Sequence, residues 1–532
     1  MEYDIAPIAE KLSVPHDALI PFGYDKAKID TSKLKVGDRK GKLILCTAIT
    51  PTKAGEGKTT SAIGLADGLS LLGKNALACL REPSLGPVFG VKGGGAGGGE
   101  ATLVPEDDIN LHFTGDMHAI TSANNLIAAL IDNELYQHSP LDVDPEKIIF
   151  PRCMDMNDRS LRDIEVARND PHTIAHASSF VITAASEVMA VFCLSKNEED
   201  FLDRIDRITV AYSKSGKPIF VKDLECREAI RLLMHTALYP NLVQTKYHTP
   251  ALVHGGPFAN IAHGTNSLIA TDLALRLADY VVTEGGFGSD LGMEKYMDIV
   301  SPLGSFHPDC IVMVCSIRAL KLHGGVKFEN LKEENVEAVK TGLANLEHHL
   351  NNVAAYHVPA VVGINEFKED TEAEIKAVED FLKAKKIRFA LNSAYLNGPK
   401  GAKDLAEAVL KTLEEEKSEY APLVTEEDSI EEKIAKIAHT IYGAKDVEYA
   451  PGVLEQIEEF RKEGYGKFNV CISKTPNSLS DDPHLLNVPK DHTLHVRKLR
   501  LFTGASFIVP LTGDVFTMPG LPKVPAAKKM GK

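Results

Sequence analysis

The chain of 532 residues carries 59 lysines and arginines against 74 aspartates and glutamates, a formal net charge of −15, and 44% of its residues are apolar. This length exceeds what one hydrophobic core usually supports, so we expect about two or three domains. The composition excludes a collagen, a disordered chain or a disulfide scaffold, and the negative charge argues against a nucleic-acid partner.

The acidic N-terminal residues 1–4 lead into no apolar signal region, and no apolar run approaches the length of a membrane span. The eight cysteines are scattered, with no pair at metal-ligand spacing, so we expect reduced cysteines in the core. The sequence therefore predicts a cytoplasmic protein with no membrane partner.

Short apolar runs alternate with longer helical patterns along the chain, which is typical of an α/β protein with a largely parallel sheet. A three-four spacing of apolar residues over 336–353 predicts a helix, and Ser429 with Glu432 forms a capping box that predicts another. The runs predicted to be strands are 43–49, 75–80, 147–150, 280–283, 310–315, 359–364, 387–391 and 468–472.

A glycine loop follows the first of these runs and precedes a helical pattern, which is the context that a P-loop requires. Glycines let the backbone N–H groups face phosphates, Lys58 supplies a positive charge, and Thr59 offers a hydroxyl to magnesium. The loop departs from the usual pattern because Thr52 stands where the first glycine is expected, and Gly55 can supply that flexibility. The predicted nucleotide-binding residues are Thr52, Lys53, Ala54, Gly55, Glu56, Gly57, Lys58 and Thr59.

Signatures of other enzyme classes are missing from the sequence. The glycine cluster at 93–98 fits a dinucleotide fingerprint only because nearly every residue is glycine, and His254 begins an esterase-like segment that has no accompanying nucleophile elbow. We therefore expect neither NAD binding nor hydrolase chemistry.

Several ordered blocks resemble formate–tetrahydrofolate ligases, also called formyltetrahydrofolate synthetases. The most specific are 81–90, the glycine cluster, and 108–116; further matching blocks are 156–159, 254–264, 280–292, 478–483 and 507–525. This resemblance covers essentially the whole chain. It implies that ATP phosphorylates formate and that a folate nitrogen attacks the bound formyl phosphate, which gives 10-formyltetrahydrofolate, ADP and phosphate.

The resemblance also implies roles for residues outside the loop. Arg81 is expected to bind formyl phosphate through bidentate hydrogen bonds, and Lys58 is expected to neutralise charge on the transferred phosphoryl group. Asp116 and His112 lie in one matching block and are candidates for proton handling. The catalytic set is thus Lys58, Arg81 and Asp116, with Thr59 as the metal ligand.

Two aromatic rings are expected to sandwich the folate pterin. Phe367 matches one ring of the family, and Tyr395 stands where the family usually has tryptophan, in a chain that contains no tryptophan. Glu366 replaces a usual arginine, Thr265 a cysteine, and residues 476–477 a glutamine–tyrosine pair. These departures concern the folate side more than the ATP side.

The implied fold is P-loop NTPase-like. We expect a large nucleotide and formyl phosphate domain (1–335), an α/β domain with the folate-stacking rings (336–455) and a C-terminal domain (456–532). The resemblance further implies small-molecule substrates, magnesium, activation by potassium or ammonium, and a homotetramer. Two alternatives stay open: a related P-loop ligase acting on another acid and acceptor, and a nucleotide-gated regulatory protein with a diverged folate site.

Overall fold

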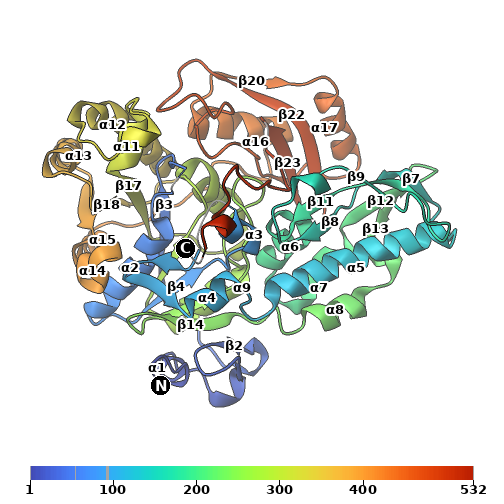
Figure 1. The fold of residues 1–532 in the computed structure, drawn as a ribbon, viewed down its shortest axis with the longest axis horizontal. Coiled ribbons are helices and arrows are strands. Elements are labelled where there is room, and N and C mark those ends of the chain that lie inside the picture. Colours follow the sequence, from blue (N-terminus) through green and yellow to red (C-terminus); the bar gives the residue numbers. More distant parts are fainter. Residues whose placement is uncertain (1, 54, 91–94, 514, 531–532) are drawn as a thin grey trace.

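The computed structural model describes residues 2–53, 55–90, 95–513 and 515–530, and twelve strands of this part of the chain form one sheet (Figure 1). Seven neighbouring strands of the sheet are parallel, and the remaining five pair antiparallel at one side. The order is β1 (Leu19–Pro21), β2 (Ala27–Ile29), β14 (Asn241–Thr245), β15 (Pro250–Val253), β4 (Ala76–Leu80), β16 (Tyr280–Glu284), β3 (Lys42–Ala48), β17 (Cys310–Ser316), β18 (Ala360–Asn365) and β19 (Arg388–Asn392), with β6 (Ala101–Val104) pairing β14 and β5 (Gly97–Gly98) pairing β6.

Both faces of the parallel strands are buried, because alternate side chains of each strand enter different cores. Ile44 and Cys46 of β3 pack with α2 (Lys58–Leu71) and α15 (Lys403–Glu415). Leu43 and Leu45 belong to the core on the other face, which contains α9 (Leu268–Leu277), α12 (Val336–Ala354) and α13 (Glu372–Ala384). This double coverage explains why the strands read as continuous apolar runs.

Most of the predicted elements are confirmed. Strands predicted at 43–49, 75–80, 280–283, 310–315, 359–364 and 387–391 correspond to β3, β4, β16, β17, β18 and β19, and the helix predicted over 336–353 is α12. The capping box is also confirmed, since the Glu432 N–H donates to Ser429 Oγ (3.2 Å) and the Ser429 N–H to Glu432 Oε2 (2.7 Å) at the start of α16 (Ile430–Ile437).

Two predicted strands lie outside the large sheet, and six strands of that sheet were not predicted: β1, β2, β5, β6, β14 and β15. The run 147–150 only overlaps the end of β7 (Val143–Ile148), and 468–472 contains the short β21 (Asn469–Val470). Strands β14 and β15 escaped notice because buried polar residues such as Asn241 and Gln244, and the leading Pro250, hide the apolar pattern.

Smaller layers flank the large sheet. On one side lie α5 (Asp116–Tyr136), α7 (Glu198–Asp206), α8 (Arg227–Met234) and the sheet formed by β7, β12 (Thr209–Ser213) and β13 (Pro218–Phe220), at the right of Figure 1. At the top lie α16, α17 (Val453–Lys462) and the sheet of β20 (Asp446–Tyr449), β22 (Thr493–Phe502), β23 (Phe507–Thr512) and β21. The large sheet draws strands from both sides of residue 335, and this last sheet from both sides of residue 455.

The chain changes direction across the sheet at β3. From β3 it passes through α2 to β4 on one side, whereas from β16 it crosses to β17 on the other. In open α/β sheets such a switch leaves a crevice at the carboxyl ends of the strands, where ligands bind. The glycine loop follows the carboxyl end of β3 and therefore lies at this point.

Candidate functional site

The glycine loop connects β3 to the N-terminus of α2. Gly55 and Gly57 have positive φ angles of 77° and 71°, and a Cβ on Gly57 would lie 2.4 Å from Asn365 Nδ2. Gly57 therefore requires glycine, and the left-handed backbone at Gly55 favours it. Thr52 replaces the expected first glycine, and its backbone N–H donates to Glu56 Oε1 (2.6 Å); Ala54 lies outside the described residues, and Lys53 is exposed.

Lys58 and Thr59 are the first residues of α2; Thr59 contacts the last residue of β16, and Lys58 contacts the segment that follows it. Lys58 Nζ donates to the backbone oxygen of Phe287 (2.9 Å), and Thr59 Oγ1 donates to Glu284 Oε2 (2.9 Å). Because the N-terminus of a helix carries free N–H groups and a positive dipole end, this arrangement favours a bound polyphosphate.

Glu284 is a site residue that the sequence did not single out. It ends β16, which pairs in parallel with β3, and its carboxylate is 3% exposed. Oε2 accepts from Thr59, while Oε1 lies 3.6 Å from Arg81 Nη2. The available signal was an acidic residue at the end of an apolar run. The matching block 280–292 did not indicate that this residue would contact Thr59 and Arg81.

Arg81 follows β4, so its guanidinium enters the same edge of the sheet. Its side chain is 23% exposed, Nη1 donates to the Pro257 oxygen over a long 3.4 Å, and Nε is buried with no hydrogen-bond partner among the residues that the structure describes. A Cβ on Gly286 would lie 2.8 Å from Nη1, so the absence of that side chain makes room for the guanidinium. A partly buried guanidinium with weak hydrogen bonds has donor capacity for an anion.

Asp116 begins α5 and lies in a buried polar cluster. Its two oxygens meet Lys28 Nζ (2.6 Å) and Asn241 Nδ2 (2.6 Å). Glu82 lies beside this cluster, and burial, reinforced by the charge of Asp116, raises the pKa of the Glu82 carboxyl well above its ordinary value. Asp116, by contrast, has a cationic partner in Lys28. His112 of the same block is exposed.

Phe367 and Tyr395 follow the neighbouring strands β18 and β19. The strands pair Asn365 with Asn392, so both rings emerge at the carboxyl edge. Phe367 already has one cationic neighbour, since the Arg318 guanidinium carbon lies 3.9 Å from its ring centroid. Tyr395 is 46% exposed and lies against Gly99, where a Cβ would come within 3.0 Å of its ring. An exposed ring beside glycines is available for stacking.

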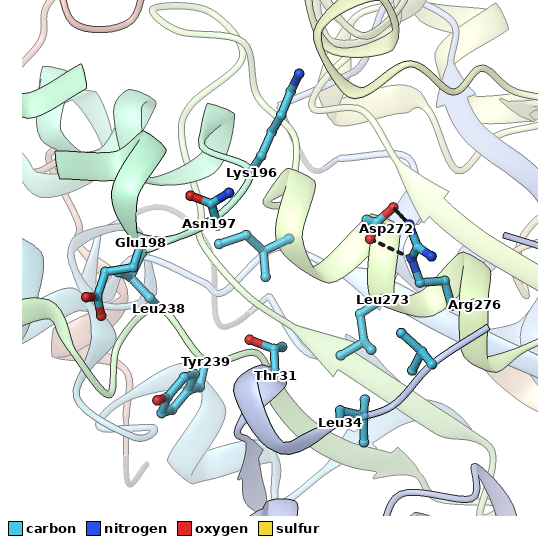
Figure 2. A pocket seen from close by; sticks show the side chains of 12 residues that line it. Thr31, Leu34, Lys196, Asn197, Glu198, Leu238, Tyr239, Asp272, Leu273 and Arg276 are labelled. Atoms are coloured by element: carbon cyan, nitrogen blue, oxygen red, sulfur yellow. Dashed lines mark hydrogen bonds and ion pairs between the residues drawn. The ribbon is translucent and has the colours of Figure 1, made fainter. Parts of the chain in front are cut away.

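A cavity of about 300 Å³ (Figure 2) has none of these residues in its lining. It is lined by Leu34 before β3 and by Asp272, Leu273 and Arg276 of α9, which leads into β16. The cavity therefore lies toward the amino-terminal ends of the strands, and the crevice at their carboxyl ends is the better candidate site.

Metal ligands supplied by the protein are few. Within the described ranges no group of three or more histidines, cysteines, aspartates or glutamates could hold a metal ion. Thr59 and Glu284 bring two oxygens together, which fits magnesium because this ion usually takes one or two protein oxygens and completes its shell with phosphates and water.

Comparison with known protein families matches nearly the whole chain to one family model. The family model described as formate–tetrahydrofolate ligase matches residues 2–531. The match includes the glycine loop, Arg81, Asp116 and the two aromatic positions. Separately, the described part of the chain contains no helix long and apolar enough to cross a membrane.

Proposed function

We propose, from the premise that this chain belongs to the formate–tetrahydrofolate ligase family, that its crevice at the carboxyl ends of β3, β4 and β16 makes and consumes formyl phosphate. The chain is an ATP-dependent ligase that joins formate to tetrahydrofolate and gives 10-formyltetrahydrofolate. One observation carries the proposed site: Glu284 contacts both Thr59 of the glycine loop and Arg81. The ATP site at the glycine loop and the formyl phosphate site at Arg81 would therefore be adjacent.

The first step is phosphoryl transfer at a P-loop NTPase-like loop formed by residues 52–59. A formate oxygen attacks the terminal phosphorus of ATP, and ADP leaves. The loop N–H groups and Lys58 stabilise the charge on the transferred group, which is how proteins accelerate such transfers. Thr59 and Glu284 would hold magnesium, which supplies charge neutralisation between the phosphates.

The second step moves the formyl group. Arg81 holds formyl phosphate in two-pronged contact, the folate nitrogen attacks the formyl carbon, and phosphate leaves as the carbon–nitrogen bond forms. The attacking nitrogen loses its proton. Asp116 is assigned to this proton, supported by its contact with Lys28 and by its place beside Glu82, whose pKa is raised by burial.

Tetrahydrofolate would place its pterin between Phe367 and Tyr395. This assignment is supported by the parallel register of β18 and β19, which brings both rings to the sheet edge that carries the glycine loop. The tyrosine ring offers a smaller face than that of tryptophan, but it can make the same aromatic stacking contact.

An omission assay tests this function. Steady ADP production should require ATP, magnesium, formate and tetrahydrofolate together, because formyl phosphate stays bound until the folate nitrogen attacks it. Equal ADP release in the absence of formate would contradict the ligase mechanism.

Four further properties are proposed. The family resemblance implies activation by potassium or ammonium and a homotetramer, and the sequence predicts a cytoplasmic location and division at residues 335 and 455. Eight free, buried cysteines support a reducing compartment. Sedimentation velocity tests the oligomer, titration with potassium or ammonium chloride at constant ionic strength tests the cation, and limited proteolysis tests the division.

A further inference from the structure

Arg318 lies between the nucleotide loop and the folate ring. It is the second residue of α11 (Ile317–His323), directly after β17. Strand β17 is flanked by β3, which leads into the glycine loop, and by β18, which leads to Phe367. A long side chain at this position can therefore reach both neighbours.

One guanidinium makes contacts in both directions. Arg318 Nη2 donates to the backbone oxygen of Gly55, and Nε lies 3.7 Å from Glu56 Oε2. The same guanidinium covers the Phe367 ring at 3.9 Å. The side chain is 24% exposed, so these contacts are partly shielded from solvent.

The contact with Gly55 orients the loop. In a trans peptide the C=O and the following N–H point in opposite directions, so holding the Gly55 oxygen aims the Glu56 N–H away from Arg318. Asn365 Nδ2 donates to the Glu56 oxygen (2.9 Å) and so aims the Gly57 N–H away from Asn365. Two successive N–H groups are thereby directed away from Arg318 and Asn365, which leaves them available to a phosphate.

Glu56 anchors the other end of this arrangement. Its carboxylate is 1% exposed and accepts from the Thr52 N–H and from the Ser316 hydroxyl, directly before α11. The loop and the start of α11 are thus joined through one buried carboxylate. A change in loop conformation must move Arg318 or break its contacts.

We propose that Arg318 is a positioning residue that couples nucleotide binding at the glycine loop to folate binding on Phe367. This inference rests on the proposed function of those two sites. A nucleotide that fixes the loop also fixes the Gly55 oxygen, which holds the guanidinium over one face of Phe367. The ring is then ordered before the pterin arrives, so less ordering entropy opposes folate binding.

The test measures linkage between the two ligands. Equilibrium dialysis gives the dissociation constant of tetrahydrofolate with and without saturating magnesium and a β,γ-imido analogue of ATP, in the absence of formate. In the unmodified protein the analogue should tighten folate binding about fivefold or more, the lower end of usual coupling, and folate should tighten the analogue equally. The coupling ratio is the dissociation constant of tetrahydrofolate without the analogue divided by that with it. In Arg318→Ala this ratio should fall to about one.

Arg318→Lys separates charge from geometry. A lysine keeps the charge but has a single point donor, so it cannot hold the Gly55 oxygen and cover the ring together; its ratio should also fall to about one. Arg39→Ala is the matched control, because Arg39 donates to the Ser305 oxygen (2.7 Å), pairs with Asp272 (2.5 Å) and lies over Phe306 (5.3 Å). It should keep the full ratio.

The outcomes distinguish the inference from the proposed function. Independent binding of the two ligands to the unmodified protein, or an unchanged ratio in folded Arg318→Ala and Arg318→Lys, overturns the coupling role while leaving the ligand sites in place. Unchanged folate affinity in Phe367→Leu overturns the folate site itself and with it the coupling. The inference is supported only if the ratio falls to about one in both Arg318 variants and stays unchanged in Arg39→Ala.

Discussion

Replacing Arg81 with leucine should separate ATP binding from formyl transfer. Leucine keeps an apolar stem of similar length but removes every donor of the guanidinium. In the proposed mechanism ATP is held by the loop N–H groups and Lys58, so Arg81→Leu should bind ATP with nearly unchanged affinity. Lys58→Ala should weaken both ATP binding and turnover.

The size of the effect follows from the contacts of Arg81. Loss of one preorganised donor to a developing oxyanion costs about 10²–10³ in turnover, or roughly 2.7–4 kcal/mol. Its contribution to folding is smaller: the Arg81 to Glu284 distance is 3.6 Å and the arginine is 23% exposed, so solvent screening limits the pair to about 1 kcal/mol or less. Activity should therefore fall far more than stability.

The assay combines ADP release under saturating substrates, ATP-analogue binding and thermal unfolding. Arg276→Leu is the matched control, because Arg276 is similarly exposed (28%) and pairs with Asp272 at 2.8 Å at the opposite ends of the strands. It should show a comparable change in unfolding temperature with normal turnover. Normal turnover in Arg81→Leu would refute the placement of formyl phosphate.

Two further predictions concern folate binding and pH. Tyr395→Ala should weaken tetrahydrofolate binding by roughly two- to twelvefold from lost stacking alone, with ATP binding unchanged, and Tyr395→Trp should bind as well or better; equilibrium folate binding measures both, and unchanged affinity in Tyr395→Ala would show that the pterin is held elsewhere. Burial raises the pKa of Glu187 to about 8, against the opposing hydrogen bond from the Gly504 N–H, so the folded protein keeps a proton that the unfolded chain loses above about pH 4.5, and stability should fall as pH rises to about 8. Glu187→Gln should flatten that fall by up to ~1.4 kcal/mol per pH unit in unfolding experiments, whereas the exposed Glu329→Gln should keep it; an unchanged slope in Glu187→Gln would contradict the assignment.

Local sequence patterns determined the strands that build the parallel sheet. β3, β4, β16, β17, β18 and β19 are apolar on both faces, so their runs stand out without knowledge of their partners. The glycine loop was equally visible, because its glycines, lysine and threonine are contiguous. The family resemblance came from ordered blocks of sequence and is supported by a match over residues 2–531.

Only the tertiary structure decided which side chains meet in the crevice. Thr59 and Glu284 are 225 positions apart, and Arg318 and Gly55 are 263 apart, yet each pair is in hydrogen-bond contact. No local pattern encodes these contacts, because they depend on which strands become neighbours. Parallel pairing brings the carboxyl ends of distant strands to one edge of the sheet, and the order of the strands, fixed by how both faces are buried, selects the residues that face each other there.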